Sequence, residues 1–243
     1  MSKLGKYLIF LSKLFTNPEK FRVYWALTMQ ECKDIGINSM LIVTIVSSFL
    51  GAVTCVQTAA NMENPFVPKY IISLIVRDST ILELGPTITC VVLAGKIGSN
   101  IAGQLGTMRI TEQIDALEVM GINSPSYLVL PKMIAAMLTF PMLVTMACFL
   151  GIYGGYLAGW LTGSVTQQSY IYGLQFDFKP NYVLFALIKS VVFGFLVASI
   201  AAFQGFYTKG GAYEVGKAST AAVTNACIAI LIADYLLAQL LVG

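Results

Sequence analysis

Two carboxylates in this sequence, Glu83 and Asp234, stand in long apolar segments, where an ionisable side chain could do chemistry. A charge at membrane depth is costly and therefore faces a cavity, a partner or the interface. Paired acids of this kind could carry ions in a secondary transporter, or perform acid–base chemistry in an intramembrane enzyme. Lys96 and Lys189 are basic residues in comparable positions.

Other catalytic groups are scarce in the sequence. It contains no histidine, which excludes the zinc-protease motif, a Ser/His protease and imidazole proton shuttles. The five cysteines stand singly, mostly in apolar segments, and predict small buried side chains with no metal site or disulfide framework. An ion-coupled transporter usually shows internal repeats, and we find none. The cysteines are Cys32, Cys55, Cys90, Cys148 and Cys227.

One segment, "GAYEVGKAS" at residues 211–219, partly matches a phosphate-binding loop through Gly216 and Lys217. Ala218 stands where the magnesium-binding Ser or Thr belongs, and no hydrophobic strand precedes the segment. We therefore expect this chain to bind no ATP, magnesium or other cofactor.

The composition is that of an integral membrane protein. Of the 243 residues, 57% are hydrophobic and 11% are charged, and the mean hydropathy is +0.76. A helix needs about 20 apolar residues to cross a bilayer. We predict an all-α protein with about five spans. Four of them are Ser39–Ala60, Tyr127–Leu161, Tyr182–Phe206 and Ala218–Val242, and the fifth lies within Tyr70–Gly106, from about Leu82.

We divide the chain into an N-terminal helical segment, 1–38, and a transmembrane domain, 39–243. Apolar residues recur at helical spacing near the N-terminus, with lysines opposite them, which predicts an amphipathic helix in the interface. The apolar residues are Leu4, Tyr7, Leu8, Leu11, Leu14 and Phe15, and the lysines are Lys3, Lys6 and Lys13.

Basic residues gather on the cytoplasmic side of membrane proteins, which predicts a cytoplasmic N-terminus. The residues placed inside are Lys3, Lys6, Lys13, Lys20, Arg22, Lys33, Arg109, Lys132, Lys209 and Lys217, against Lys69, Arg77 and Lys179 outside.

A short cytoplasmic helix is predicted at about 111–120, between the second and third spans. Thr111 could cap it, and Gly121 could end it. Ten residues extend only about 15 Å, too short to cross a bilayer. Ile114 and Leu117 would face the protein, while acidic residues point away, so the helix either meets a soluble partner or is merely solvated.

Small residues recur every three or four positions in two of the predicted spans, which permits close helix packing. They include Gly95, Ser99 and Gly103 in the second span and Gly155 and Gly159 in the third.

Two longer stretches resemble MlaE-type permeases, the membrane subunits of MCE-associated ABC transporters. They are "ELGPTITCVVLAGKIGSNIAGQLGTMRITEQIDALEVMG" at 83–121 and "FQGFYTKGGAYEVGKASTAAVTNACIAILIADYLL" at 203–237.

The resemblance implies a non-catalytic homodimer in the bacterial inner membrane. It implies a separate cytoplasmic ATPase that uses ATP and magnesium, a periplasmic MCE protein and a phospholipid substrate, and no nucleic acid. The predicted short helix would be the coupling helix, contacting the ATPase through Glu112, Gln113, Asp115, Leu117 and Glu118.

The resemblance also places Glu83 and Lys189 near the lipid-binding cavity. The family often has Arg before this Glu, whereas this chain has Leu82, so its head-group chemistry could differ. The two residues could instead pair to hold helices together, or Lys189 could extend to the interface.

Overall fold

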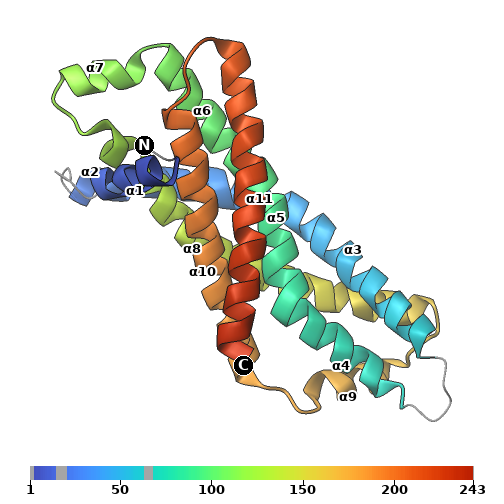
Figure 1. The fold of residues 1–243 in the computed structure, drawn as a ribbon. Helices are drawn as coiled ribbons and strands as arrows, with labels where there is room; N and C mark the ends of the chain where they lie inside the picture. Colours follow the sequence, from blue (N-terminus) through green and yellow to red (C-terminus); the bar gives the residue numbers. More distant parts are fainter. Residues whose placement is uncertain (1–2, 15–20, 63–67, 243) are drawn as a thin grey trace. The chain divides into compact units, whose positions relative to one another are not determined.

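The structure, a computed structural model, describes residues 3–14, 21–62 and 68–242, and these residues form helices and no strand (Figure 1). The all-α prediction is confirmed. The α-helices are α1 (Lys3–Leu14), α2 (Phe21–Cys32), α3 (Asn38–Asn61), α4 (Tyr70–Ser79), α5 (Thr89–Leu93), α6 (Ser99–Ile110), α7 (Gln113–Val119), α8 (Ser124–Leu161), α9 (Gln167–Gln175), α10 (Pro180–Phe206) and α11 (Ala212–Val242). Three π-helical segments are η1 (Lys33–Ile37), η2 (Thr80–Ile88) and η3 (Ala94–Gly98).

Five helical stretches are long and apolar enough to cross a membrane, as predicted. They are Arg22–Asn61, Tyr70–Ile110, Ser124–Leu161, Pro180–Phe206 and Ala212–Leu240. The second is helical from Tyr70 onward and not only from Leu82, because π turns in η2 accommodate Pro86 without ending the helix. Its 41 residues extend about 60 Å, so only part of it lies in hydrocarbon.

The chain forms two compact units. Unit 1 comprises Met1–Ser39, Val91–Phe140 and Val191–Gly243, and unit 2 comprises Met40–Cys90 and Pro141–Ser190. The boundaries fall inside α3, α5, α8 and α10. The division of the chain at residue 38, expected from the sequence, stays a prediction.

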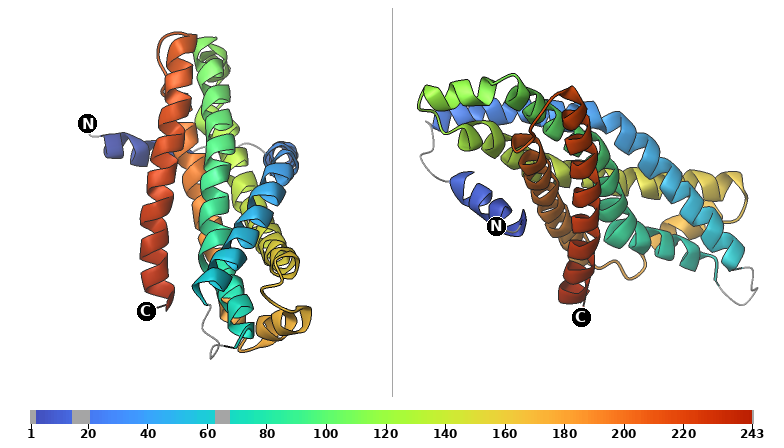
Figure 2. Two further views of the ribbon diagram at one scale, coloured as in Figure 1. Left: turned by 90° about the vertical axis from the view of Figure 1, so that its right-hand side faces the viewer. Right: turned by 45° about the horizontal axis from the view of Figure 1, so that its top comes forward.

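In unit 1, α6 lies beside α10 and α11 (Figure 2). Glycines allow this approach: a Cβ on Gly205 of α10 would come within 2.6 Å of the Ala102 carbonyl oxygen of α6. A Cβ on Gly106 of α6 would lie 3.1 Å from Val215 of α11. Small residues thus set the spacing of these three helices, as expected where helices pack in lipid.

Helix α1 also belongs to unit 1 and crosses α10 (Figures 1 and 2). Phe10 is fully buried against Phe203 and Phe206, and the Tyr7 hydroxyl lies 2.8 Å from that of Ser199. Burial raises the pKa of Tyr7, which keeps this hydroxyl protonated at neutral pH. Phe10, absent from the predicted apolar set, is the main anchor, and Leu8 is exposed. Phe15 lies outside the described residues.

In unit 2, α3, α4 and α9 pack around the second half of α8. The core contains Cys55, Ile72, Val76, Val165 and Tyr170. The Tyr170 hydroxyl donates to the Ile152 carbonyl oxygen at 3.0 Å, and burial raises the pKa of Tyr170. The closest contacts join α3 and α8, where a Cβ on Gly154 would come within 2.2 Å of the Ser48 carbonyl oxygen.

We expect Gly154→Ala to destabilise unit 2, because a backbone atom cannot move aside as a flexible side chain can. Overpacking of this kind costs about 1–3 kcal/mol. Gly216→Ala is the matched control, since a Cβ there meets no described atom within 4 Å and alanine favours a helix. Thermal unfolding in one detergent would compare them; an unchanged Gly154→Ala variant would contradict the close approach of α3 and α8.

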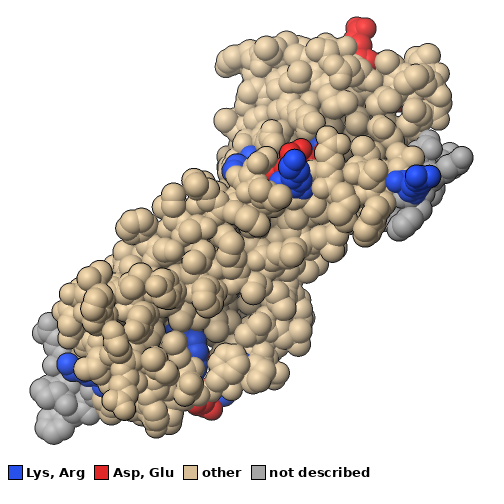
Figure 3. Space-filling model, turned by 180° about the vertical axis from the view of Figure 1, so that it is seen from behind, with Lys and Arg blue, Asp and Glu red and all other residues tan. Residues whose placement is uncertain are grey.

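The surface of the described residues is predominantly apolar. Large hydrophobic side chains are exposed along the spans, including Leu41, Phe49, Met142, Phe149, Ile232 and Leu240. On the face shown in Figure 3 charged groups are few, and the most prominent ones, both blue and red, lie together in its upper part. Exposed apolar area on this scale indicates contact with lipid or with other membrane subunits.

Candidate functional site

Glu83 and Lys189, the predicted lipid-binding residues, form an ion pair in unit 2. The Lys189 Nζ lies 3.0 Å from Glu83 Oε1 and donates to the Leu82 carbonyl oxygen at 3.1 Å. Pro86 has no N–H, so the backbone of η2 lacks one hydrogen bond near that carbonyl. Lys189 therefore supports η2 at its proline as well as neutralising Glu83.

The two partners differ in exposure. The side chain of Lys189 is 4% exposed and that of Glu83 is 51% exposed. The second oxygen of Glu83 has only a weak contact, with the Thr87 hydroxyl at 3.5 Å. The carboxylate can thus accept a hydrogen bond from an incoming group while its charge stays paired.

Arg77 is a buried charge whose role the sequence did not reveal. Its Nε donates to Asp78 Oδ1 at 2.8 Å, and its Nη1 donates to the carbonyl oxygens of Leu174 and Phe176, each at 2.8 Å. These carbonyls belong to the C-terminal end of α9, where helical carbonyls lack internal partners. Arg77 therefore fastens α9 to α4.

Helix α7, the predicted coupling helix, begins later than expected. Thr111 does not cap it, because its hydroxyl donates back to the Thr107 carbonyl oxygen at the end of α6. Glu112 takes the N-cap position, with a left-handed φ of 61° and no side-chain cap bond. Gly121 follows the helix with φ of 79°, the conformation that suits a glycine stop.

Two polar contacts hold α7 in unit 1. Arg109 of α6 pairs with Asp115 at 2.6 Å, and Ser124 at the start of α8 donates to Glu118 at 2.8 Å. Ile114 is fully buried beneath the helix and Leu117 is half-buried. Asp115 and Glu118, predicted as partner contacts, thus also have contacts inside the chain.

The outer side of α7 combines polar and apolar groups. Glu112 and Gln113 are exposed, and beyond them Val119 is 89% exposed and Met120 66%. This apolar tip was not predicted from the sequence. An exposed apolar pair beside acidic groups is a surface suited to a protein partner.

The predicted packing residues differ in their surroundings. A Cβ on Gly155 would come within 2.7 Å of the Tyr170 hydroxyl, one on Gly159 within 3.2 Å of Cys55 Sγ, and one on Gly103 within 3.4 Å of Ser219. Ser99 bonds to its own helix. A Cβ on Gly95 would meet no described atom within 4 Å, so its packing role stays a prediction.

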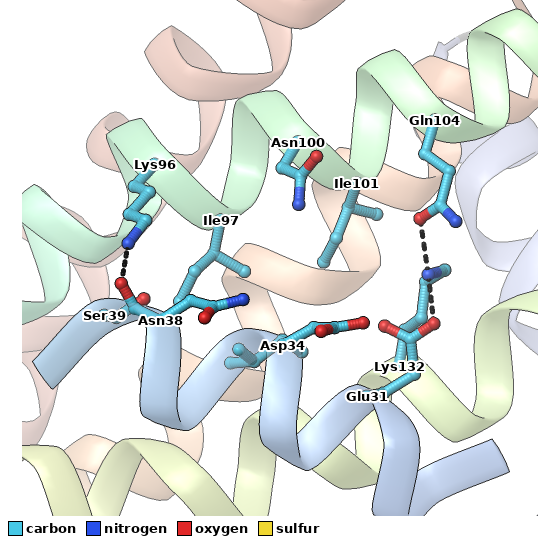
Figure 4. Close-up of a pocket in the computed structure, with 11 residues that line it drawn as sticks. Glu31, Asp34, Asn38, Ser39, Lys96, Ile97, Asn100, Ile101, Gln104 and Lys132 are labelled. Carbon is cyan, nitrogen blue, oxygen red and sulfur yellow. Dashed lines mark hydrogen bonds and ion pairs between the residues drawn. The ribbon is translucent and has the colours of Figure 1, made fainter.

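The remaining candidates belong to unit 1. Asp234 is half-buried on α11 and belongs to unit 1, whereas Glu83 belongs to unit 2. Gly216 and Lys217 lie within α11 and not in a loop. Lys96 donates to the Asn38 carbonyl oxygen in a polar cavity of unit 1 (Figure 4), which the sequence analysis missed.

The fold and these polar positions define an all-helical, multi-span membrane protein with a short helix beside its spans. Residues 28–240 match the model of the family described as Permease MlaE, and the chain belongs to this family of ABC transporter permeases. The resemblance drawn from the sequence is confirmed.

Relatives match over nearly the whole chain. A "Probable ABC transporter permease protein" of Rickettsia bellii is 36% identical, over 98% of this chain and 91% of that protein. A similarly named protein of Synechocystis is 34% identical, over 88% and 81%. The "Intermembrane phospholipid transport system permease protein MlaE" of Haemophilus influenzae is 27% identical, over 99% and 92%.

Proposed function

We propose that this chain is the non-catalytic permease subunit of an ATP-driven transporter. It moves phospholipid between the bacterial inner membrane and a periplasmic MCE protein, and thereby contributes to outer-membrane lipid homeostasis. A separate subunit binds ATP and magnesium and performs the hydrolysis. Support comes from the family and from the Haemophilus relative, whose name describes intermembrane phospholipid transport.

The geometry of α7 is the observation that best supports a contact between this chain and the ATPase. The helix is fixed below by Ile114, Asp115 and Glu118, so a force applied to it passes to α6 and α8. Its outer groups, Glu112 and Gln113 together with the tip of Val119 and Met120, are available to a partner. This is the arrangement that a coupling helix requires.

Two copies of the chain form the transporter in this proposal, and each N-terminus is cytoplasmic. The distribution of basic residues supports that orientation. Exposed apolar helices supply surface for a second copy as well as for lipid. The MCE protein meets the dimer on the side opposite α7.

Glu83 and Lys189 contact the lipid head group in this proposal. Because Lys189 is buried, Glu83→Gln removes the carboxylate that pairs with its charge, which we expect to cost about 1–3 kcal/mol even though the hydrogen bond to the Leu82 carbonyl oxygen remains. Lys189→Met should instead free Glu83, with a smaller cost because that carboxylate is half-exposed. Both should lower phospholipid recovery.

The double variant Glu83→Gln/Lys189→Met separates lipid contact from structural pairing. Stability should return toward that of the unmodified protein, since no unpaired charge remains. Phospholipid recovered per protein, measured by mass spectrometry, should stay low. Normal lipid recovery in a stable double variant would show that the pair only holds helices together.

The assembly is tested by purifying the chain at native abundance in mild detergent and identifying the proteins and lipids that accompany it. We expect an ABC ATPase in equal amount, an MCE protein, and phospholipid. Repeated recovery of the chain without an ATPase, under several mild conditions, would overturn the proposal.

A further inference from the structure

A polar cavity of about 290 Å³ lies within unit 1, between α2–η1 on one side and η3–α6 on the other (Figure 4). Lys132 of α8 closes one end. Several lining residues are exposed, among them Asp34, Asn38 and Asn100, so the cavity opens to the surface. All of its lining residues belong to unit 1, whereas Glu83 and Lys189 belong to unit 2.

Two lysines that line the cavity already donate hydrogen bonds within the chain, but neither uses all three of its N–H groups. Lys132 is 5% exposed in its side chain, and its Nζ donates to Glu31 at 2.5 Å and to Gln104 at 2.7 Å. Lys96 donates to the Asn38 carbonyl oxygen. Because an ammonium group has three N–H donors, Lys96 keeps spare donors for a ligand.

Other lining groups have no partner among the described residues. The Ser39 hydroxyl is fully buried and makes no hydrogen bond there, which is unusual for a buried polar atom. The Asp34 carboxylate lines the same cavity and has no hydrogen bond or ion pair with another described residue. A ligand in the cavity would supply what these groups lack.

The charged residues that line the cavity have no net charge, but their positive and negative groups lie apart. Lys96 stands at one end, the Glu31–Lys132 pair stands at the other, and Asp34 lies between them (Figure 4). Since Glu31 is neutralised by Lys132, the open charges are Lys96 and Asp34. A simple anion would be repelled by Asp34, and a simple cation would be repelled by Lys96. A small zwitterion can place an opposite charge against each of them.

The cavity also lies at a defined level of the second span. Gln104 and Lys96 precede the end of α6 at Ile110 by six and fourteen residues, or about 9 and 21 Å along the helix. Because α7 follows α6 directly, Gln104 marks the end of the cavity nearer to α7 and Lys96 the end farther from it.

We propose that this cavity binds a phosphate joined to a primary ammonium, as the head group of a phospholipid. The phosphate contacts Lys96, and the ammonium contacts Asp34. The inference rests on the proposed function and deepens it, because it adds a second lipid station and a head-group preference to the Glu83–Lys189 site.

The test uses the full chain in nanodiscs of equal phosphatidylethanolamine and phosphatidylglycerol, with a photoreactive amino acid in place of Asn100. We expect at least fivefold more crosslinking to phosphatidylethanolamine. Asp34→Asn should abolish this preference, and Lys96→Gln should reduce crosslinking to both lipids severalfold. Glu214→Gln is the control, because Glu214 is an acid outside the cavity.

Equal crosslinking of the two lipids, unchanged by Asp34→Asn, would overturn the proposal. Excess soluble O-phosphoethanolamine distinguishes a lipid ligand from a free, water-soluble one. Complete loss of lipid crosslinking in its presence would overturn the assignment of a lipid ligand, and lipid crosslinking that persists would support it. A second photoreactive position, Thr87 beside Glu83, reports on the proposed function itself. Lipid at position 87 but not at 100 would refute only this inference, whereas lipid at neither would count against both.

Discussion

Val119→Asp is expected to reduce ATPase association at least about tenfold and to abolish ATP-dependent transport. Val119 is 89% exposed at the end of α7, so the substitution removes no contact inside the chain. It places a charge on the apolar tip of the proposed interface, where desolvated apolar residues would contribute to binding. Co-purification and the ATPase rate of the reconstituted complex measure the effect.

The control for this variant is Val119→Ile, which keeps the apolar tip and should retain the ATPase. Reversing the charge of Asp115 is a less specific experiment, because Asp115 pairs with Arg109 and the change would also loosen α7. Charge reversal at Glu112 avoids this difficulty. If Val119→Asp bound the ATPase normally, α7 would not be the point of contact.

Arg77→Met is expected to destabilise unit 2 by about 3–5 kcal/mol, because a buried partner is removed from Asp78 and from the last carbonyls of α9. For a chain of this size, that loss lowers the melting temperature by roughly 6–20 °C. Arg77→Lys should recover only part of it, since one ammonium cannot match the planar guanidinium fork.

Lys179→Met provides the control for Arg77, because Lys179 is a basic residue near the same end of α9 but is 55% exposed in its side chain. Its removal should change the melting temperature little. Thermal unfolding of the three variants in one detergent makes the comparison. A melting temperature for Arg77→Met as high as that of Lys179→Met would contradict the role of Arg77 in holding α9.

The sequence predicted the features that depend on periodicity and length. Five apolar runs became five spans, and the acidic run near Asp115 became a short helix between the second and third of them. Gly121 was identified as its stop because few other residues adopt a left-handed φ easily. These signals are local, so one sequence suffices to detect them.

Features that depend on contacts between distant segments could not be predicted in this way. Arg77 meets carbonyls about 97 to 100 residues further along the chain, and Lys132 meets Glu31 across 101 residues. Backbone carbonyls carry no residue-specific signal, so nothing in the sequence marks α9 as the partner of Arg77. The helical continuity through Pro86 depends on π turns, which also lack a clear sequence signature.

The most direct test of the central claim is lipid transfer by proteoliposomes that contain this chain, its ATPase and the MCE protein. We expect transfer of labelled phospholipid that requires ATP and the ATPase and does not respond to collapse of the proton gradient. Transfer by the chain alone, driven by a proton gradient and lost in Glu83→Gln or Asp234→Asn, would contradict the account and indicate an ion-coupled transporter.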